Sequence, residues 1–474
     1  MRSLSFAALV AATVACTADL PAPAVPNLST NDPSVDRARP PAQAAAPKVE
    51  PPRGVVLTRL WARTVGRTDE HSTMALSGRT IVIGTHGGSY DAIDEAADAV
   101  YLIDATTGAV IRTISAPGHG NRDVNGVAVD AGRVFFSTGN GQVVGARLDG
   151  TILWARPLGS QALAAPTLVE VTGDGALDVV VGDERGRVHA LDGHTGEEIW
   201  TRSLPLSPAA RATIEAGIGS ADLDGDGIRE LVVGSWDGTL SAMKLDGEVL
   251  WSVRGDGRLR ATPILADLDG DGHPEVLGDW ETGEVKVLDG RTGEEMWRAD
   301  VGRQQNVRVK LLGSPVPYDL SSRGLLAVPV GREPAGDGLY LLGEFGLVSR
   351  SGDGRVVGTP LVASVDPGGP QSVLFGTSAG EVVTIDRYAR RTTVATVGGP
   401  IEASPMVADV AGDGTYATLV AANDGVLTCF AGGAKEAPLV GRFRGDSATN
   451  DGVMKPTNLR WSFHRTPGLA IASP

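Results

Sequence analysis

The sequence has few cysteines, a deficit of positive charge and no long apolar run, and each shortage excludes a class of protein. Its cysteines are Cys16 and Cys429, and because Cys16 lies in an N-terminal leader, no disulfide framework can form in the body of the chain. The net charge of −15 creates a surface that repels phosphate backbones, so we expect no nucleic-acid partner. Beyond the leader, no stretch is long and apolar enough to span a bilayer as a helix.

Glycine is abundant instead, with 63 glycines in 474 residues, which is about twice the usual share. Many glycines between many short apolar runs indicate many tight turns, and therefore an all-β chain. The hydrophobic content of 42% is sufficient for a large buried core.

The first residues resemble a bacterial lipoprotein signal. Arg2 supplies a positive charge, residues 4–14 are apolar, and small residues then lead to Cys16. In such signals the cysteine is lipidated, which predicts an exported protein anchored through Cys16 in the outer membrane or periplasm, or released outside the cell. The departure is Thr13, where the motif usually has leucine, and ordinary secretory cleavage near Ala15 is the alternative.

The predicted organisation has four parts. Residues 1–16 form the signal peptide, and residues 17–53, rich in proline and alanine, form a disordered tether because they cannot bury enough apolar surface to fold. Residues 54–454 form the folded body, and residues 455–474 form a C-terminal tail.

The folded body repeats with a period of about 45 residues, which is typical of propeller arrays. Six copies start at an aligned turn residue, and two weaker copies near Met74 and Val127 precede them. The sequence therefore predicts an eight-bladed β-propeller of four-stranded antiparallel blades, with seven blades as the alternative. The aligned turn residues are Pro166, Ile218, Pro263, Pro315, Pro360 and Pro405.

The last strand of several units carries a tryptophan. The clearest copies read Asp-Gly-x-Thr-Gly-Glu-x-x-Trp at residues 192–200 and 289–297, and shorter copies end at Trp154 and Trp251. This pattern resembles the repeat of PQQ-like propellers, and the resemblance implies that each tryptophan packs between blades. Trp61 lies in a similar strand ahead of the first unit, so we expect that strand to pair with the last blade and close the ring.

Two acidic loops, residues 222–230 and 267–275, carry carboxylates at loop positions 1, 3, 5 and 9. Ca²⁺ prefers six to eight oxygen ligands, and position 7 can add a backbone carbonyl. The loops resemble FG-GAP (integrin-type) repeats rather than EF-hands, because strands flank them and position 12 is not acidic. The alternative is that Asp-Gly pairs simply form turns. The predicted Ca²⁺ ligands are Asp222, Asp224, Asp226, Ile228 and Glu230 in the first loop, and Asp267, Asp269, Asp271, His273 and Glu275 in the second.

Other candidate sites are weaker. Residues 170–178 and 409–417 look like degenerate acidic loops that have kept the turn. Quinoprotein dehydrogenases, which the repeat resembles, hold PQQ under adjacent cysteines, and with Cys429 alone in the mature body we do not expect PQQ. His71, His86 and His119 lie in glycine-rich loops, together with Asp69, Asp91 and Asp94, so either a central metal or sugar site or solvated loop histidines would explain them.

These features predict a monomeric, calcium-stabilised scaffold without catalytic activity, which binds a protein or polysaccharide on a propeller face. Its tethered, acidic form is similar to the lipoprotein propeller of the outer-membrane β-barrel assembly machinery. The alternatives are a polysaccharide lyase-like enzyme, since rhamnogalacturonan lyases are propellers with related calcium loops, and an integrin-type surface adhesin. A ring of histidines, aspartates and aromatics at the channel mouth would favour the enzyme, and a smooth apolar rim would favour the scaffold.

Overall fold

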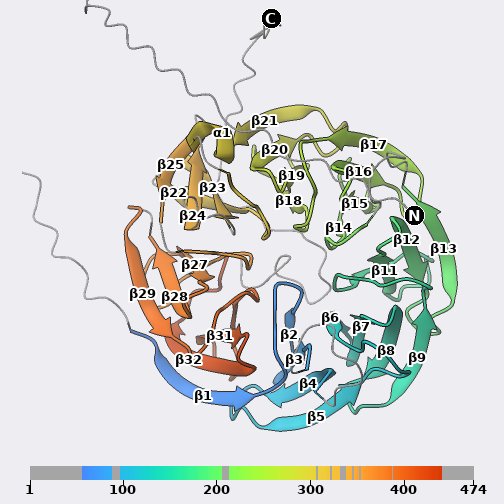
Figure 1. Cartoon of the computed structure of the whole chain (residues 1–474), viewed down its shortest axis with the longest axis horizontal. Coiled ribbons are helices and arrows are strands. Elements are labelled where there is room, and N and C mark those ends of the chain that lie inside the picture. Colours follow the sequence, from blue (N-terminus) through green and yellow to red (C-terminus); the bar gives the residue numbers. More distant parts are fainter. Residues whose placement is uncertain are drawn as a thin grey trace, which may run out of the picture. The chain divides into compact units, whose positions relative to one another are not determined.

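The computed structural model describes residues 56–87, 97–204, 213–305, 308–320, 323–330, 338–343, 346–351, 354–386 and 388–439. These residues form eight four-stranded sheets arranged as blades around a centre (Figure 1). All neighbouring strands within a blade are antiparallel. The predicted eight-bladed propeller is confirmed and the seven-bladed alternative is wrong. Cys16, the tether and the tail lie outside the described residues.

The first four blades follow one another along the chain, each built from consecutive strands. Blade 1 contains β2 (Met74–Ser77), β3 (Thr80–Gly84), β4 (Ala99–Asp104) and β5 (Val110–Ser115). Blade 2 contains β6 (Val124–Asp130), β7 (Arg133–Thr138), β8 (Gln142–Arg147) and β9 (Ile152–Pro157). Blade 3 contains β10 (Thr167–Val169), β11 (Asp178–Gly182), β12 (Arg187–Leu191) and β13 (Glu198–Ser203). Blade 4 contains β14 (Gly219–Ala221), β15 (Glu230–Gly234), β16 (Thr239–Met243) and β17 (Val249–Arg254).

Blades 5 to 7 continue this order, and blade 8 takes its outer strand from the start of the folded body. Blade 5 contains β18 (Ile264–Ala266), β19 (Glu275–Asp279), β20 (Glu284–Leu288) and β21 (Glu295–Asp300), and the short helix α1 (Val301–Gln305) follows it. Blade 6 contains β22 (Val316–Leu320), β23 (Arg323–Val330), β24 (Gly338–Gly343) and β25 (Gly346–Arg350). Blade 7 contains β26 (Leu361–Ala363), β27 (Ser372–Gly376), β28 (Glu381–Ile385) and β29 (Arg391–Thr396). Blade 8 contains β30 (Met406–Ala408), β31 (Tyr416–Ala422), β32 (Val426–Ala434) and β1 (Thr58–Thr64).

The ring closes through β1, as the position of Trp61 predicts. β1 pairs with β32 from Thr58 opposite Ala431 to Thr64 opposite Val426. Since the two strands come from the beginning and the end of the repeat array, their pairing ties the array into a circle without an open sheet edge at the junction.

The hydrophobic pattern explains which strand takes which place in a blade. All five residues of β11 are buried, as are all five of β15, because these strands are continuous apolar runs with a blade on each face. The outer strand β13 has one fully buried residue, Trp200, and otherwise exposed or half-buried side chains. Burial therefore decreases from the inner strands to the rim.

Tryptophans of the outer strands join successive blades. The ring of Trp154 packs on Gly196 of the next blade, where a Cβ atom would lie 2.5 Å from the indole and where φ is +70°, so only glycine fits without strain. The indole nitrogens donate to backbone carbonyls of the following blade, which confirms the packing that the repeat pattern implied. These hydrogen bonds join Trp61 to Ala105 (3.1 Å), Trp154 to Gly193 (3.3 Å), Trp200 to Leu245 (2.7 Å) and Trp251 to Gly290 (2.9 Å).

Hydroxyl groups join the inner strands in the same way. Thr167 Oγ1 donates to the carbonyl of Ile218, 2.6 Å away in the next blade, and the amide of Thr359 donates to Ser404 Oγ at 2.9 Å. Blades 3 and 4, for example, are joined at the inner end by Thr167 and at the outer end by Trp200. Within the described residues, no helix has the length and apolar character needed to cross a bilayer.

Candidate functional site

The centre of the ring is lined by one repeated position, three residues before the aligned turn residue of blades 3 to 8. At this position blades 4, 5 and 8 have Glu215, Arg260 and Glu402, which line cavities at the centre. The corresponding residues of blades 3, 6 and 7 are apolar, and they are Leu163, Leu312 and Val357. Sequence reasoning missed these residues, although the register that identified the blades also marks them.

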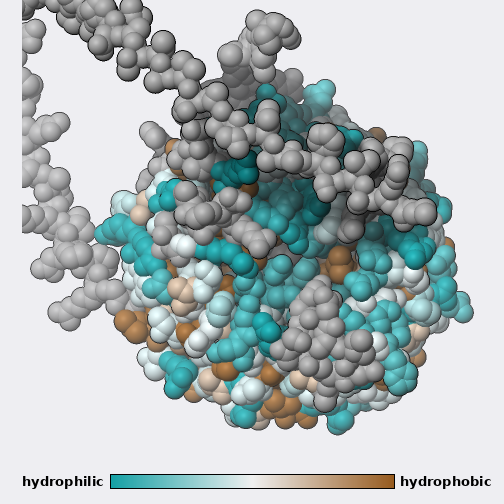
Figure 2. Space-filling model, viewed as in Figure 1, coloured by the Kyte–Doolittle hydropathy of each residue, from teal (hydrophilic) through white to brown (hydrophobic). Residues whose placement is uncertain are grey.

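The larger of these cavities, here called the axial cavity, has a volume of about 420 Å³. It is big enough for a small organic ligand or several waters. Hydrophilic side chains gather around the hollow centre of the face in Figure 2. Charged, polar and aromatic residues line the axial cavity, including Arg67, Asp69, Glu70, His71, Trp236 and Asn423.

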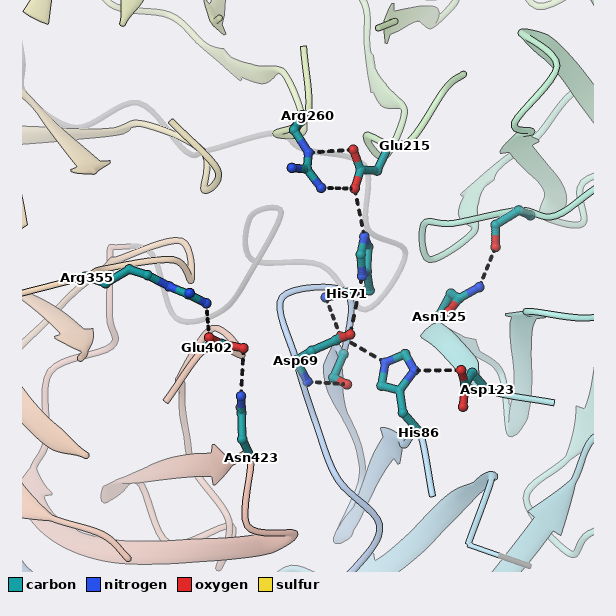
Figure 3. Close-up of polar contacts among 12 residues, drawn as sticks. Asp69, His71, His86, Asp123, Asn125, Glu215, Arg260, Arg355, Glu402 and Asn423 are labelled. Carbon is teal, nitrogen blue, oxygen red and sulfur yellow. Dashed lines mark hydrogen bonds and ion pairs between the residues drawn. The ribbon is translucent and has the colours of Figure 1, made fainter. Parts of the chain in front are cut away.

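A chain of ion pairs crosses the centre of the ring, and we call it the axial network (Figure 3). The loop between β1 and β2 brings Asp69 and His71 to the centre, and His71 Nε2 lies 3.2 Å from Glu215 Oε1. Glu215 precedes the first strand of blade 4, so this contact links blades on different sides of the ring. The network consists of Arg260, Glu215, His71, Asp69, His86 and Asp123.

Besides His71, the side chains of Arg260 and Trp236 donate hydrogen bonds to the carboxylate of Glu215. Arg260 donates from Nε at 2.7 Å and from Nη2 at 2.6 Å, and the indole nitrogen of Trp236 donates at 2.6 Å. Burial alone would raise the pKa of Glu215, but the hydrogen bonds from His71 and Arg260 outweigh it and lower that pKa to about 2. Glu215 is therefore a fixed anion at neutral pH.

Asp69 lies between two histidines. Its Oδ1 is 2.9 Å from His86 Nε2, and its Oδ2 is 3.5 Å from His71 Nδ1. Burial opposes the charged imidazolium, yet the Asp69 carboxylate and its hydrogen bonds outweigh burial, so the pKa of His86 rises to about 9 and that of His71 also lies well above its ordinary value. Burial likewise opposes the charged carboxylate, but the two histidines hold the pKa of Asp69 well below its ordinary value. Without a ligand, the network alternates positive and negative charge.

A second cluster of polar side chains lies beside the axial cavity, on the blade 8 side (Figure 3). Arg355 donates to Glu402 Oε1, and Asn423 Nδ2 donates to Glu402 Oε2 at 2.6 Å. Polar and charged side chains thus line the centre of the ring among the described residues, where a scaffold was expected to have a smooth apolar channel mouth.

The histidines divide into two groups. His71 and His86 are part of the axial network, with side chains that are 13% and 2% exposed, so the interpretation as solvated loop histidines is wrong for them. His119 is exposed and fits that interpretation. Asp91 and Asp94 lie outside the described residues.

The two acidic loops lie at the other end of the first strands. Glu215 comes before β14 and Asp222 follows it directly, so the strand separates the axial network from the first acidic loop. In each loop the three aspartates can bring one oxygen each to within 4.8 Å of one another. The converging aspartates are Asp222, Asp224 and Asp226, and in the second loop Asp267, Asp269 and Asp271.

The glutamate at position 9 of each loop turns back to the loop's own backbone. Glu230 accepts a hydrogen bond from the amide of Leu223 at 2.8 Å, and Glu275 accepts one from Leu268 at 2.6 Å. Burial and then the neighbouring aspartates raise the pKa of Glu230, and they raise that of Glu275 to about 8. Each loop therefore concentrates more negative charge than its surroundings neutralise.

The remaining predicted residues are also located. Ile228 is 58% exposed at the tip of the first loop, and the ring of His273 packs so closely on Gly225 that a Cβ there would lie 2.6 Å away. The second acidic loop thus contacts the first. Cys429 is buried in β32, and burial raises the pKa of its thiol to about 12.

Two family models match parts of the chain. One, described as the outer membrane protein assembly factor BamB and built on PQQ-like repeats, matches residues 58–225, and the other, an FG-GAP-like repeat, matches residues 222–278. A curated relative, the outer membrane protein assembly factor BamB of Yersinia pestis, is 24% identical over 261 residues. The match covers 52% of this chain and 61% of that protein, so this chain spans less than two thirds of the relative's length.

Solved structures share the fold at low sequence identity. BamB from Moraxella catarrhalis has a TM-score of 0.54 at 15% identity, with 79% of this chain and all (100%) of that chain covered. A europium-containing methanol dehydrogenase has a TM-score of 0.56 at 17% identity, with 77% and 84% covered. Since both a protein assembly factor and a dehydrogenase share the architecture, these likenesses show the fold alone. The chain is an eight-bladed β-propeller whose repeats match a PQQ-like family model over residues 58–225 and an FG-GAP-like repeat model over residues 222–278.

Proposed function

We propose that this protein is an exported β-propeller scaffold that binds a protein partner at the cell envelope. The observation that carries the proposal is the match to an outer membrane protein assembly factor, both as a family model over residues 58–225 and as a curated relative at 24% identity. Because function does not follow from fold, the partner of this chain has to be established by experiment.

The rim of the ring supports a protein partner. Aliphatic side chains stand exposed at matching positions of outer strands, next to the tryptophan or its equivalent. These residues lie on blades 8, 1, 2 and 4, and a series at one repeated position differs from single hydrophobic residues scattered over a soluble surface. They are Leu60 (53% exposed), Ile111 (55%), Leu153 (36%) and Leu250 (42%).

Photo-crosslinking in the native envelope tests the proposal. A photoreactive amino acid at Leu60, Ile111 or Leu250 is expected to capture the same partner protein. The matched control is Glu248, a charged turn residue whose side chain is 61% exposed. Equal capture from Glu248, or none from the rim positions, would contradict a scaffold that binds through its rim.

We further propose that the two acidic loops bind structural Ca²⁺. Each offers clustered aspartate oxygens, a buried glutamate and a glycine at position 6, such as Gly227 with φ +87°, which allows the tight turn. Both join the first strand of a blade to the second, so the ion would fix that turn. The donor set consists of hard oxygens, which fits Ca²⁺, and the raised pKa of Glu275 is what uncompensated neighbouring carboxylates produce.

A lipid at Cys16 is proposed to hold the protein to the membrane, with residues 17–53 as the tether. The motivation is the leader sequence, since these residues lie outside the described structure.

The polar centre of the ring favours a second candidate function, a carbohydrate-active propeller. Incubation with a panel of acidic polysaccharides, followed by detection of released oligosaccharides, distinguishes the two, because a scaffold releases none.

A further inference from the structure

We propose that Asp69, Glu70 and His71 form a binding site for a divalent transition-metal ion, such as Zn²⁺, that opens onto the axial cavity. The three residues are consecutive in the loop between β1 and β2, and each can place one ligand atom within 4.8 Å of the others. The site is separate from the acidic loops, which lie at the opposite ends of the first strands.

The contacts of His71 leave one ring nitrogen directed at the cluster. Its Nε2 faces Glu215 Oε1 at 3.2 Å, and because that carboxylate is bound by Arg260 on both oxygens, it can only accept a proton from the ring. A carboxylate behind one ring nitrogen is the arrangement that orients metal-binding histidines, since it holds a proton at that nitrogen and leaves the other to a metal once its own proton is released. Here that other nitrogen is Nδ1.

Nδ1 of His71 is buried, and Asp69 Oδ2 is the group that it faces in the described structure. It lies 3.5 Å from Asp69 Oδ2, which is too long for a good N–H···O hydrogen bond. Two ligands of one tetrahedral metal at bond lengths of about 2.1 Å are roughly 3.4 Å apart. The separation of these two atoms therefore matches an edge of a coordination polyhedron.

The carboxylate of Asp69 is oriented by contacts at its other oxygen. Oδ1 accepts a hydrogen bond from the backbone amide of His71 at 2.9 Å and lies 2.9 Å from His86 Nε2. These contacts leave Oδ2 directed towards His71 Nδ1 (Figure 3). His86 is thus a positioning residue for Asp69, just as Glu215 is for His71.

Glu70 supplies a third ligand. It lines both central cavities, and its carboxylate interacts electrostatically with the charged side chains of His71 and Arg260. Among the described acidic residues that line the axial cavity, Asp69, Glu215 and Glu402 each have a hydrogen bond or ion pair, whereas Glu70 interacts with His71 and Arg260 through charge alone. A cation shared with Asp69 and His71 would bind the Glu70 carboxylate directly.

The donor set selects the kind of metal. One imidazole nitrogen with carboxylate oxygens suits zinc or another first-row divalent ion, whereas Ca²⁺ prefers oxygen ligands throughout. Three protein ligands beside a cavity of about 420 Å³ leave a coordination position open to water or to a small ligand. In the absence of metal, a proton on His71 occupies the same place, so metal and proton exclude one another there.

Zn²⁺ titration of the full chain, after treatment with chelator and in excess Ca²⁺ to occupy the acidic loops, tests the site. Calorimetry and elemental analysis are expected to find one Zn²⁺ per chain, and Co²⁺ in its place should give a visible ligand-field spectrum with a nitrogen ligand. Glu70→Gln and His71→Ala, which each remove one of the three ligands, should each weaken Zn²⁺ binding by about tenfold or more.

The control is His119→Ala, which removes an exposed histidine and should leave Zn²⁺ binding unchanged. Thermal melting of each variant in Ca²⁺ separates loss of the site from loss of folding, and Glu70→Gln should melt as the wild type does. The proposal is overturned if the calcium-loaded wild type binds no Zn²⁺, or if the Glu70→Gln/His71→Ala double variant binds it with unchanged affinity.

Discussion

The carboxyl group of Asp279 can be used to measure how burial changes a pKa in this propeller. The residue ends β19, is 2% exposed, and its Oδ2 has no hydrogen-bond partner in the described structure. The corresponding residues of blades 3, 4 and 7 are the glycines Gly182, Gly234 and Gly376. Burial raises the pKa of Asp279 from 3.8 to about 8, because no cation is near enough to stabilise the carboxylate.

The sign of the effect on stability follows from this pKa. The folded state holds the proton more tightly than the unfolded state, so the contribution of Asp279 is fully favourable below the unfolded pKa near 4 and is lost as the pH rises to about 8. At about 1.4 kcal/mol per pKa unit, the loss amounts to roughly 5 kcal/mol. Asp279→Asn, which keeps the shape and cannot ionise, should avoid it.

Denaturant unfolding of the wild type and Asp279→Asn, in excess Ca²⁺ and at about pH 5, 7 and 9, measures the difference. We expect the variant to gain stability relative to the wild type as the pH rises, by several kcal/mol at the highest pH. Asp183→Asn is the matched control, because Asp183 is equally buried but is bound by Arg187, His189 and Ser160. That variant should be less stable than the wild type at neutral pH. A difference between Asp279→Asn and the wild type that does not change with pH would refute the reasoning.

Three further predictions concern the calcium loops, the anchor and the axial network. EDTA should lower the melting temperature without abolishing the fold, since each ion at 100-fold excess over its Kd contributes about 2.7 kcal/mol. In calorimetry, Asp224→Ala and Asp269→Ala together should remove most of this calcium effect, and Asp413→Ala should remove little of it. An unchanged melting curve with no bound calcium would leave the loops as plain turns. Cys16→Ser should release the protein from the membrane fraction, and persistent membrane association without a lipid mass on the wild type would disprove the anchor. Glu215→Ala should destabilise the fold by about 3 kcal/mol, because it leaves buried cationic partners uncompensated; a loss below about 1 kcal/mol by denaturant unfolding would show that the axial network contributes little.

Much of the fold could be predicted from the sequence because the repeat is local. Each blade places its turn glycines, its buried apolar strand and its outer tryptophan within one period, so aligned copies reveal the blade and its four strands. Even the closure could be anticipated, because Trp61 marks an outer strand that has no blade of its own until β32 supplies it. The acidic loops were found for the same reason, since all their carboxylates lie within nine residues.

The axial network could not be predicted in the same way, because its members come from distant parts of the chain. His71 and Glu215 are 144 residues apart, and nothing in the local sequence of either indicates the other. The repeat register does predict that Glu215, Arg260 and Glu402 occupy equivalent positions, but it does not reveal that these positions surround an axis.

The sequence by itself determined the blades, because strand, turn and inter-blade packing follow from patterns within one period of about 45 residues. Only the tertiary structure decided the chemistry at the centre, since closing the ring brings one loop from each of several blades to a common axis. There, burial and mutual proximity set the charges of Asp69, His71 and Glu215, and these are properties of the space they share rather than of their sequence neighbours.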